Sequence, residues 1–256
     1  MNNKFKNVLI LSDFDGTFAG SKGRMVKRNL EAIEYFKNNG GHFALSTGRL
    51  PCMLNIVLPQ FREITNYPLI LANGSILFDP KTDTILSELF YDGVQARLDI
   101  NDVISKFDVV KFACYTDNGE LQSDITPNEA IGNKWRKANL TYATDDEAKK
   151  ARDYVNKTYG DRYSCYRSHY CFTEIVGIDS GKGKRISALR SLSPEPLKVC
   201  CIGDFENDIE MLKMADVAFC PSNAISEVKE VSDHIVCHHD EGAIADMITI
   251  IEEQYI

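Results

Sequence analysis

The stretch "NVLILSDFDGTFAG", residues 7–20, carries an apolar run directly into two aspartates. The run predicts a strand buried in a parallel sheet, because such strands are covered on both faces and read as continuous apolar sequence. Asp13 and Asp15 follow it, separated only by Phe14. Two like charges at the end of a buried strand repel each other and are costly to desolvate. The pair therefore indicates a site where a cation or a chemical step needs both carboxylates.

Strand and helix patterns alternate in the first and last parts of the chain. We predict strands and helices in the order strand 7–12, helix 26–38, strand 42–46, strand 68–73, then helix 183–192, strand 197–204, helix 208–214, strand 217–220, helix 224–231, strand 234–236 and helix 242–254. Such alternation is typical of an α/β fold with a doubly wound, mostly parallel sheet.

The middle of the chain does not show this alternation of strands and helices. After a predicted hairpin, we expect a helix over 100–107, a strand over 109–115, helices over 127–138 and 145–158, and paired strands over 162–167 and 171–175. Helices mixed with neighbouring antiparallel strands are typical of an α+β module. We therefore predict a core domain of residues 1–79 and 180–256, interrupted by an α+β cap domain of residues 80–179.

Acidic residues recur at the predicted end of a second core strand. In "GDFENDIEML", Asp204 ends the strand and Asp208 opens the next helix. Ligands of open parallel sheets bind at the carboxyl ends of the strands, so these residues should face Asp13 and Asp15. A cluster of carboxylates is the hard oxygen donor set that Mg²⁺ prefers. For Asp208 alone, capping of the helix is an alternative interpretation.

Two further motifs offer groups that bind phosphate. In "STGR", residues 46–49, Thr47 supplies a hydroxyl and Gly48 an accessible backbone N–H. In "SGKGKRISAL", Lys182 lies at the start of a predicted helix, where a cation can neutralise a phosphoryl oxygen. The apolar spacing of that helix places Lys184 on its solvated face.

The four motifs "DFDGT", "STGR", "KGKRISAL" and "GDFENDIEML", in this order, resemble those of the haloacid dehalogenase (HAD) superfamily. The whole chain resembles the Cof-like phosphatases of that superfamily, whose subclass IIB cap is inserted between the second and third motifs. The resemblance implies a HAD-like Rossmannoid core and a cap that sets substrate specificity. It also implies a hydrolase that releases phosphate from small phosphorylated metabolites such as sugar phosphates.

The resemblance assigns a role to each motif residue. Asp13 would be the nucleophile that forms an aspartyl-phosphate, and Asp15 the general acid and base. Mg²⁺ would be held by Asp13, the Asp15 backbone carbonyl, Asp204 and, through a water, Asp208. The phosphoryl group would be bound by Thr47, Gly48, Lys182, Asn207 and a backbone N–H near Phe14. We expect Thr17 to hydrogen-bond locally and shape the turn.

Two alternatives to a phosphatase stay open. One is a phosphomutase of the phosphomannomutase type, and the other is a non-catalytic sensor of a phosphorylated metabolite. The net charge of −8 disfavours nucleic acid and anionic membranes as partners. No apolar stretch approaches membrane-spanning length, and no obligate protein partner is implied, so we expect a cytoplasmic protein with free thiols.

Two groups of polar residues are interpreted as structural. In "CHHDEG", residues 237–242, the adjacent His238 and His239 are expected to point in different directions and Asp240 to cap the final helix. In the middle of the chain, we expect Trp135 in the core and Arg136 on a solvated helix face.

Overall fold

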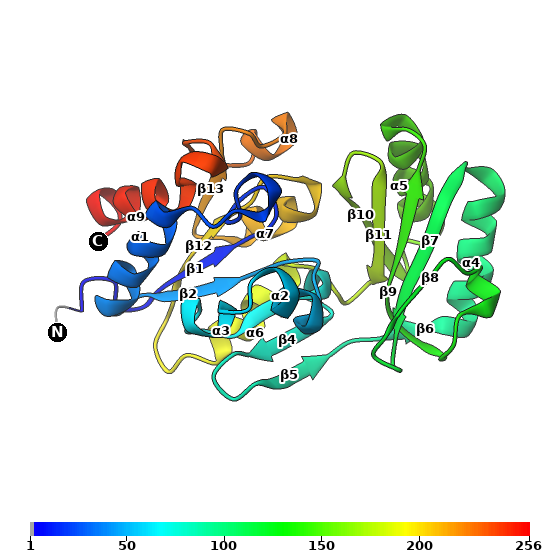
Figure 1. Ribbon diagram of the computed structural model, residues 1–256, viewed down its shortest axis with the longest axis horizontal. Helices are drawn as coiled ribbons and strands as arrows, with labels where there is room; N and C mark the ends of the chain where they lie inside the picture. Colours follow the sequence, from blue (N-terminus) through cyan, green and yellow to red (C-terminus); the bar gives the residue numbers. More distant parts are fainter. Residues whose placement is uncertain (1–2) are drawn as a thin grey trace. The chain divides into compact units, whose positions relative to one another are not determined.

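The computed structural model describes residues 3–256 and separates into two compact units (Figure 1). The first unit comprises Met1–Ser87 and Lys182–Ile256, and the second comprises Glu88–Gly181. The sequence placed the first boundary at residue 79. The segment after it forms β5 (Thr84–Glu88), which lies beside β4 (Ile76–Asp79) in the same sheet and so groups with the first unit. The role of the second unit as a cap stays a prediction.

A parallel sheet forms the centre of the first unit. Its strand order is β14-β13-β12-β1-β2, with bounds β1 (Val8–Ser12), β2 (His42–Leu45), β12 (Lys198–Ile202), β13 (Val217–Pro221) and β14 (His234–Val236). Every residue of β1 is buried, as its continuous apolar sequence predicts. The doubly wound, mostly parallel α/β core is confirmed.

Helices cover this sheet on both faces. α1 (Lys27–Asn38) packs beside α9 (Ala243–Gln254), and α7 (Ile209–Met214) contacts β12 and β13 (Figure 1). On one side of β1 the sheet continues with β2, and on the other side with β12, β13 and β14. Because right-handed crossovers lead in opposite directions from β1 and from β12, α1 and α7 lie on opposite faces of the sheet. The reversal lies between β1 and β12, which is where open α/β sheets bind ligands. Shorter helices complete the unit: α2 (Pro51–Val57), α3 (Phe61–Ile64), α6 (Ile186–Ser191) and α8 (Ser226–Lys229).

The third predicted strand joins a small antiparallel sheet. β3 (Leu69–Leu71) meets the end of β2 through a single parallel bridge between Ser46 and Ile70. The chain then turns through Ala72 and Asn73, both with φ of +50°, and returns as β4. This tight turn brings Asn73 to the edge of the sheet where the predicted site lies.

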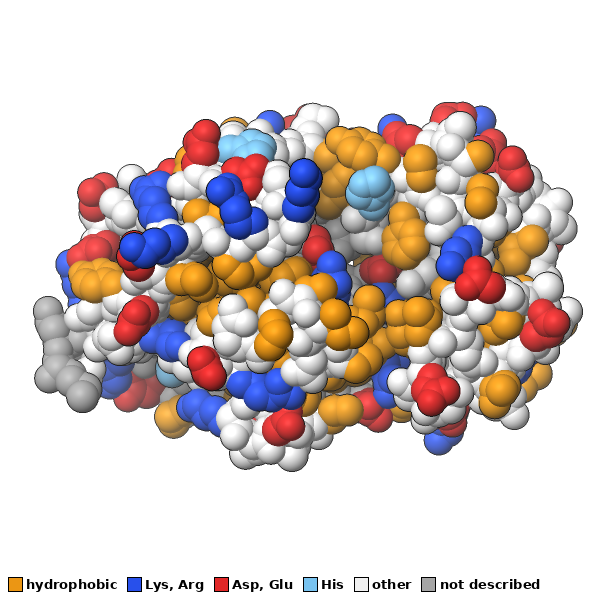
Figure 2. Space-filling model, viewed as in Figure 1, with side chains coloured by type: hydrophobic (Ala, Val, Ile, Leu, Met, Phe, Trp, Pro, Cys, Tyr) orange, Lys and Arg blue, Asp and Glu red, His pale blue; other side chains and the backbone are white. Residues whose placement is uncertain are grey.

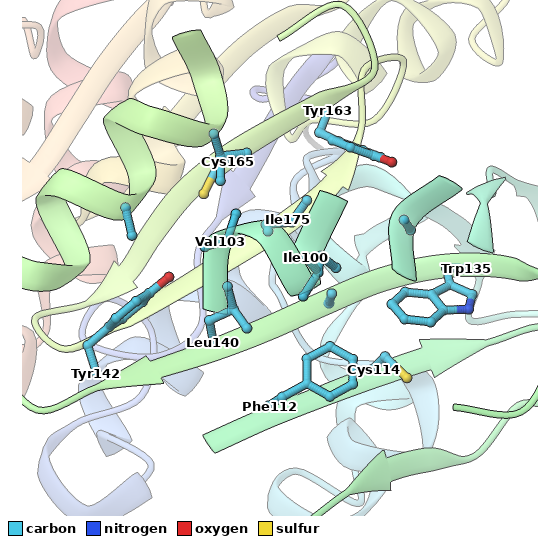
Figure 3. Packing of buried hydrophobic residues seen from close by; sticks show 14 of the residues in the cluster. Ile100, Val103, Phe112, Cys114, Trp135, Leu140, Tyr142, Tyr163, Cys165 and Ile175 are labelled. Carbon is cyan, nitrogen blue, oxygen red and sulfur yellow. The ribbon is translucent and has the colours of Figure 1, made fainter. Parts of the chain in front are cut away.

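The second unit is the predicted α+β module. Its antiparallel sheet has the order β10-β11-β9-β7-β8, with β6 paired to β9. The bounds of its elements are β6 (Tyr91–Asp92), α4 (Gly93–Lys106), β7 (Val109–Thr116), β8 (Leu121–Ser123), β9 (Lys134–Tyr142), α5 (Asp145–Thr158), β10 (Tyr163–His169) and β11 (Phe172–Gly177). Side chains from α4, α5 and the sheet form one apolar core, which includes Trp135, Phe112 and Leu140 (Figure 3). The Phe112 ring lies beside that of Trp135, with centroids 5.8 Å apart.

The predicted helix over 127–138 is wrong. Only Pro127–Glu129 form a single 3-10 turn, and the rest of the segment enters β9. β9 pairs with both β7 and β11, and these neighbours outweigh the weak local preference of "KWRKANLTY". Trp135 is fully buried, as expected. Arg136 is also buried rather than solvated, and its guanidinium donates to Glu88 at 2.7 Å.

The surface carries charges of both signs. On the face drawn in Figure 2, Lys and Arg side chains are interspersed with Asp and Glu side chains on both units. Among the described residues, no helix has the length and apolar composition needed to cross a bilayer.

We expect Leu140→Ala to lower the free energy of unfolding by about 2–5 kcal/mol, because it removes a fully buried side chain and leaves a cavity. Val110→Ala is the matched control: it shortens an apolar side chain of the same sheet that is 66% exposed, and should change stability by less than about 0.5 kcal/mol. Urea denaturation followed by circular dichroism measures both. Equal losses in the two variants would contradict this description of the core.

Candidate active site

The carboxyl ends of β1 and β12 bring three aspartates together. Asp13 follows β1 directly, and its backbone N–H donates to the carbonyl of Ile202, the last residue of β12, at 2.9 Å. The carboxylates of Asp13, Asp204 and Asp208 each place an oxygen within 4.8 Å of the others. Three of the four predicted acidic residues therefore form one cluster, while the side chain of Asp15 lies outside it.

Lys182 lies inside this cluster. Its Nζ donates to Asp13 Oδ1 and to Asp208 Oδ1, both at 2.6 Å, and the side chain is buried. Burial alone would lower the pKa of Lys182, but the carboxylates of Asp13 and Asp208 outweigh it and the net pKa is raised. Lys182 is thus a fixed positive charge between two buried carboxylates.

The remaining negative charge is poorly compensated. Burial raises the pKa of Asp13 well above its usual range; Lys182 opposes the rise, and the charge of Asp208 adds to it. Burial also raises the pKa of Asp204 to about 7, helped by Asp208 and opposed by the hydroxyl of Thr17. The cluster consequently favours a further positive charge, either a proton or a cation.

Thr17 holds Asp204 across the fold. Its hydroxyl donates to Asp204 Oδ1 at 2.7 Å, so the prediction of a purely local hydrogen bond is wrong. The close approach depends on the neighbouring glycine, because Gly16 has φ of +82° and a Cβ there would lie 2.5 Å from Asp204 Oδ2. The "DGT" part of the motif therefore positions a carboxylate that comes much later in the sequence.

Asp208 organises the loop that carries Asp204. Its Oδ2 accepts from the backbone N–H groups of Asp204 at 3.0 Å and Phe205 at 3.2 Å, while its Oδ1 accepts from Lys182. Asp208 thus makes helix-start hydrogen bonds of the kind considered as an alternative, and it also belongs to the acidic cluster.

Asp15 has a different partner. Arg49 donates to both of its oxygens, from Nε to Oδ2 at 2.7 Å and from a terminal nitrogen to Oδ1 at 2.8 Å. The Asp15 side chain is 57% exposed, whereas Asp13 is buried. The sequence analysis did not single out Arg49. The available signal was its place in "STGR", directly after β2, the strand beside β1.

The predicted phosphate ligands lie at the same edge of the sheet. Thr47 and Gly48 follow the end of β2, and Thr47 Oγ1 accepts from the Arg49 N–H at 3.2 Å. The Phe14 side chain is buried, with the Arg49 guanidinium 5.4 Å from its ring centre. Among the described residues, no carbonyl accepts from the Phe14 N–H, which leaves that donor available to an anion.

Asn207 reaches the turn after β3. Its Nδ2 donates to Asn73 Oδ1 at 3.3 Å, and both side chains are buried. The Asn73 backbone N–H in turn donates to the Thr47 carbonyl at 3.1 Å. Asn73 is a second residue that the sequence analysis did not place in the site, although the Asn-Gly turn signal marks its position.

The donor set fits a hard divalent cation. Asp13 and Asp204 each present an Oδ2 that takes no hydrogen bond from the described residues, in a cluster composed of carboxylates. Oxygen ligands of this type suit Mg²⁺ and related ions, and a cation here would relieve the repulsion among the three aspartates.

Comparison with known proteins places the chain in a family. The haloacid dehalogenase-like hydrolase family model matches residues 10–140 and 121–248. The chain is 24% identical to the 5-amino-6-(5-phospho-D-ribitylamino)uracil phosphatase YitU of Bacillus subtilis, over 94% of the chain and 96% of that protein. It is 25% identical to a phosphoglycolate phosphatase of Thermoplasma acidophilum, over 87% and 88%. Among solved structures, a haloacid dehalogenase-like hydrolase of B. subtilis superposes with a TM-score of 0.80 at 16% identity, covering 97% of this chain and 99% of that one.

Removing the buried charge of Lys182 should destabilise the protein. We expect Lys182→Met to lower the free energy of unfolding by about 3–5 kcal/mol in the presence of EDTA, because it leaves Asp13 and Asp208 buried without a cation. Excess Mg²⁺ should restore part of the loss by supplying positive charge to the cluster.

Lys184→Met is the matched control. Lys184 is two residues further on, its side chain is 34% exposed and it lies 4.0 Å from Glu210, so its loss should cost less than about 1 kcal/mol. Urea denaturation measures both variants. A Lys182→Met protein as stable as the Lys184→Met protein would contradict the role given to Lys182.

Proposed function

Because the chain belongs to the haloacid dehalogenase-like hydrolases, we propose that it is a Mg²⁺-dependent phosphatase. It hydrolyses phosphate monoesters of small metabolites through an aspartyl-phosphate on Asp13. The family match over most of the chain supports the class of reaction, and relatives along its full length are named phosphatases. The acidic cluster and its surroundings support the assignment of individual residues.

One observation carries the mechanism: the two aspartates of "DFD" lie in different environments. Asp13 is buried and bound to Lys182, with one oxygen left for bonding, whereas Asp15 is exposed and held by Arg49. Two carboxylates whose surroundings differ in this way suit two different tasks. A buried, partly neutralised carboxylate suits a nucleophile, and a solvent-exposed one suits proton transfer.

In the first step, a carboxylate oxygen of Asp13 attacks phosphorus and forms a P–O bond while the bond from phosphorus to the leaving oxygen breaks. Asp15 gives its proton to the leaving oxygen, so that an alcohol and not an alkoxide departs. Both Asp15 oxygens accept from Arg49 in the structure. Proton transfer therefore requires the Asp15 side chain to rotate away from the guanidinium and to take up a proton from solvent.

In the second step, Asp15 is a carboxylate and accepts a proton from a water molecule. The resulting hydroxide oxygen bonds to phosphorus, the bond to Asp13 breaks, and inorganic phosphate leaves. Both aspartates return to their starting states. The same residue serves as acid and then as base, which explains why one position suffices for both proton transfers.

The surrounding residues hold the phosphoryl group in line. Lys182 sits beside the Asp13 oxygen and offsets charge on the transferred group. Hydroxyl, amide and backbone donors at the same edge of the sheet bind the phosphoryl oxygens: Thr47, Gly48, Asn207 and the N–H of Phe14. Asn73 accepts a hydrogen bond from the Asn207 amide and so positions that amide for its contact with the phosphoryl group.

Mg²⁺ would be held by Asp13, Asp204 and the backbone carbonyl of Asp15. When bound, it offsets the negative charge of the phosphoryl oxygens and aligns them with the nucleophile. Both Asp208 oxygens already accept hydrogen bonds from the protein, which favours a contact with the ion through a water. Thr17 then serves to aim Asp204 at the ion.

The substrate class is a phosphorylated sugar or a similar small metabolite. The support is that YitU is named as a phosphatase of a ribityl phosphate ester, and the Thermoplasma relative as a phosphatase of phosphoglycolate. A phosphomutase and a metabolite sensor are the alternatives. Measuring inorganic phosphate separates them, because only a phosphatase releases it at each turnover.

We expect Asp13→Asn to lower phosphate release by at least about 10³-fold for every ester, because the nucleophile is lost. Asp15→Asn should spare p-nitrophenyl phosphate, whose leaving group needs no proton, and lower turnover of hexose phosphates by about 10²–10⁴-fold. Asp161→Asn is the control, since its side chain is 73% exposed and outside the site.

A malachite-green assay with and without Mg²⁺ measures all three. An active Asp13→Asn variant would rule out the mechanism, and a folded wild type that releases no phosphate would favour the alternatives.

The affinity for Mg²⁺ should depend on pH around neutrality. The pKa of Asp204 is raised to about 7 in the metal-free site, so below pH 7 a proton competes with the ion. We expect affinity to rise with pH up to about 7 and to fall by up to about tenfold per pH unit below it. Thr17→Val removes a hydrogen bond that lowers the pKa, and should move the fall to higher pH.

Isothermal titration calorimetry at several pH values measures this dependence. Thr249→Val is the matched control, because the Thr249 hydroxyl donates to a carbonyl within α9 and not to the site. A pH profile that Thr17→Val and Thr249→Val leave equally unchanged would show that Asp204 does not govern binding.

A further inference from the structure

The histidine pair before α9 is arranged differently from the expectation of a structural loop. The His238 and His239 rings lie side by side, with centroids 4.5 Å apart and planes inclined at 48°. Asp240 does not cap α9, whose N-cap is Gly242. Instead, the Asp240 carboxylate accepts from the N–H of Ser21 at 2.7 Å and from its hydroxyl at 2.6 Å. Both expectations for this segment are therefore wrong.

Three metal-ligating side chains converge here. The donor atoms of His238, His239 and Asp240 lie within 4.8 Å of one another. His238 Nδ1 and His239 Nε2 are each 3.8 Å from Asp240 Oδ2, which is too long for a hydrogen bond. Ligands on one Zn²⁺ ion, bound at about 2.0–2.2 Å, lie about 3.3 Å apart. Each ring nitrogen would therefore have to approach Asp240 Oδ2 by about half an ångström to share an ion with it.

The hydrogen bonds of the two rings direct their lone pairs toward Asp240. His239 Nδ1 lies 2.8 Å from the carbonyl oxygen of Ala19, which only accepts, so Nδ1 carries the proton and Nε2 the lone pair. A ring nitrogen that donates to a carbonyl while the other faces a metal is the usual arrangement of a histidine ligand. His238 Nδ1 accepts from the Asp240 N–H at 3.2 Å, so its lone pair also faces this residue.

We propose that His238, His239 and Asp240 form a binding site for a transition-metal ion of the Zn²⁺ type, separate from the acidic cluster. Two imidazole nitrogens and one carboxylate oxygen suit such ions, with water in the open position, whereas Mg²⁺ prefers oxygen ligands. Binding replaces the 3.2 Å hydrogen bond within the loop. It also requires the Arg24 side chain, 65% exposed and 3.4 Å from Asp240, to move into solvent.

The neighbouring thiol does not join the donor set. The Sγ of Cys237 accepts from an Arg28 nitrogen at 3.9 Å and is not among the donor atoms that converge here. The site is nevertheless tied to the loop after Asp13. Ala19 and Ser21 in that loop bond to His239 and Asp240. A bound ion would therefore fasten the loop to the segment before α9.

The test is a titration of the full chain with Zn²⁺ by calorimetry, and with Co²⁺ by visible absorption, in excess Mg²⁺ to fill the acidic cluster. We expect one ion per chain and a rise in Tm on binding. His238→Gln and His239→Gln should each weaken binding by at least about tenfold. Glutamine at position 239 keeps an N–H donor for the Ala19 carbonyl, and the Tm without metal shows that each variant is folded.

Two control variants decide the outcome. His169→Gln removes a histidine from the second unit and should bind Zn²⁺ as the wild type does. Asp204→Asn disables the acidic cluster and should also retain the ion. The proposal is overturned if Zn²⁺ binding is lost in Asp204→Asn but kept in His239→Gln, or if the wild type binds no Zn²⁺ in excess Mg²⁺.

Discussion

The contact of Lys182 with Asp13 and Asp208 is the interaction on which the site depends. It places a positive charge between two buried carboxylates that would otherwise repel each other. The three residues come from the end of β1, the chain just after the second unit, and the start of the helix after β12. A single ammonium group therefore fixes three separate segments at one edge of the sheet. The charge that remains on Asp13 and Asp204 favours a proton or a cation beside them.

Gly16 and Thr17, which directly follow Asp15, complete this arrangement. Gly16 lets the loop approach Asp204 closely, and Thr17 fixes one of that carboxylate's oxygens. Arg49 likewise holds the carboxylate of Asp15, which is exposed to solvent. Each of the four carboxylates thus has a partner from a different motif, and Asp13 and Asp208 share theirs, Lys182. The four motifs act as one unit because their side chains bond to one another, and the sheet only brings them within reach.

The sequence predicts the parallel core well because its signals are local and strong. Buried strands end in polar residues, and topology alone brings those ends together, which is why Asp13 and Asp204 could be named before their contacts were known. The pairing of Arg49 with Asp15 could not be predicted, since it depends on side-chain directions across two strands. The start of β9, which lies in the predicted helix over 127–138, was missed for a related reason: the strand is held by neighbours on both sides, and its own residues favour neither strand nor helix strongly.

The interruption of the first unit by the second has a consequence for biosynthesis. β1 pairs with β12, whose first residue is Lys198, so this pair of strands cannot form until β12 has left the ribosome. The second unit is continuous from Glu88 to Gly181 and has its own apolar core, so it is able to fold while β1 has only β2 to pair with. Asp13 reaches Lys182 and Asp208 only after the second unit has been synthesised. The nascent chain therefore carries Asp13 through the synthesis of the second unit without the residues that position it.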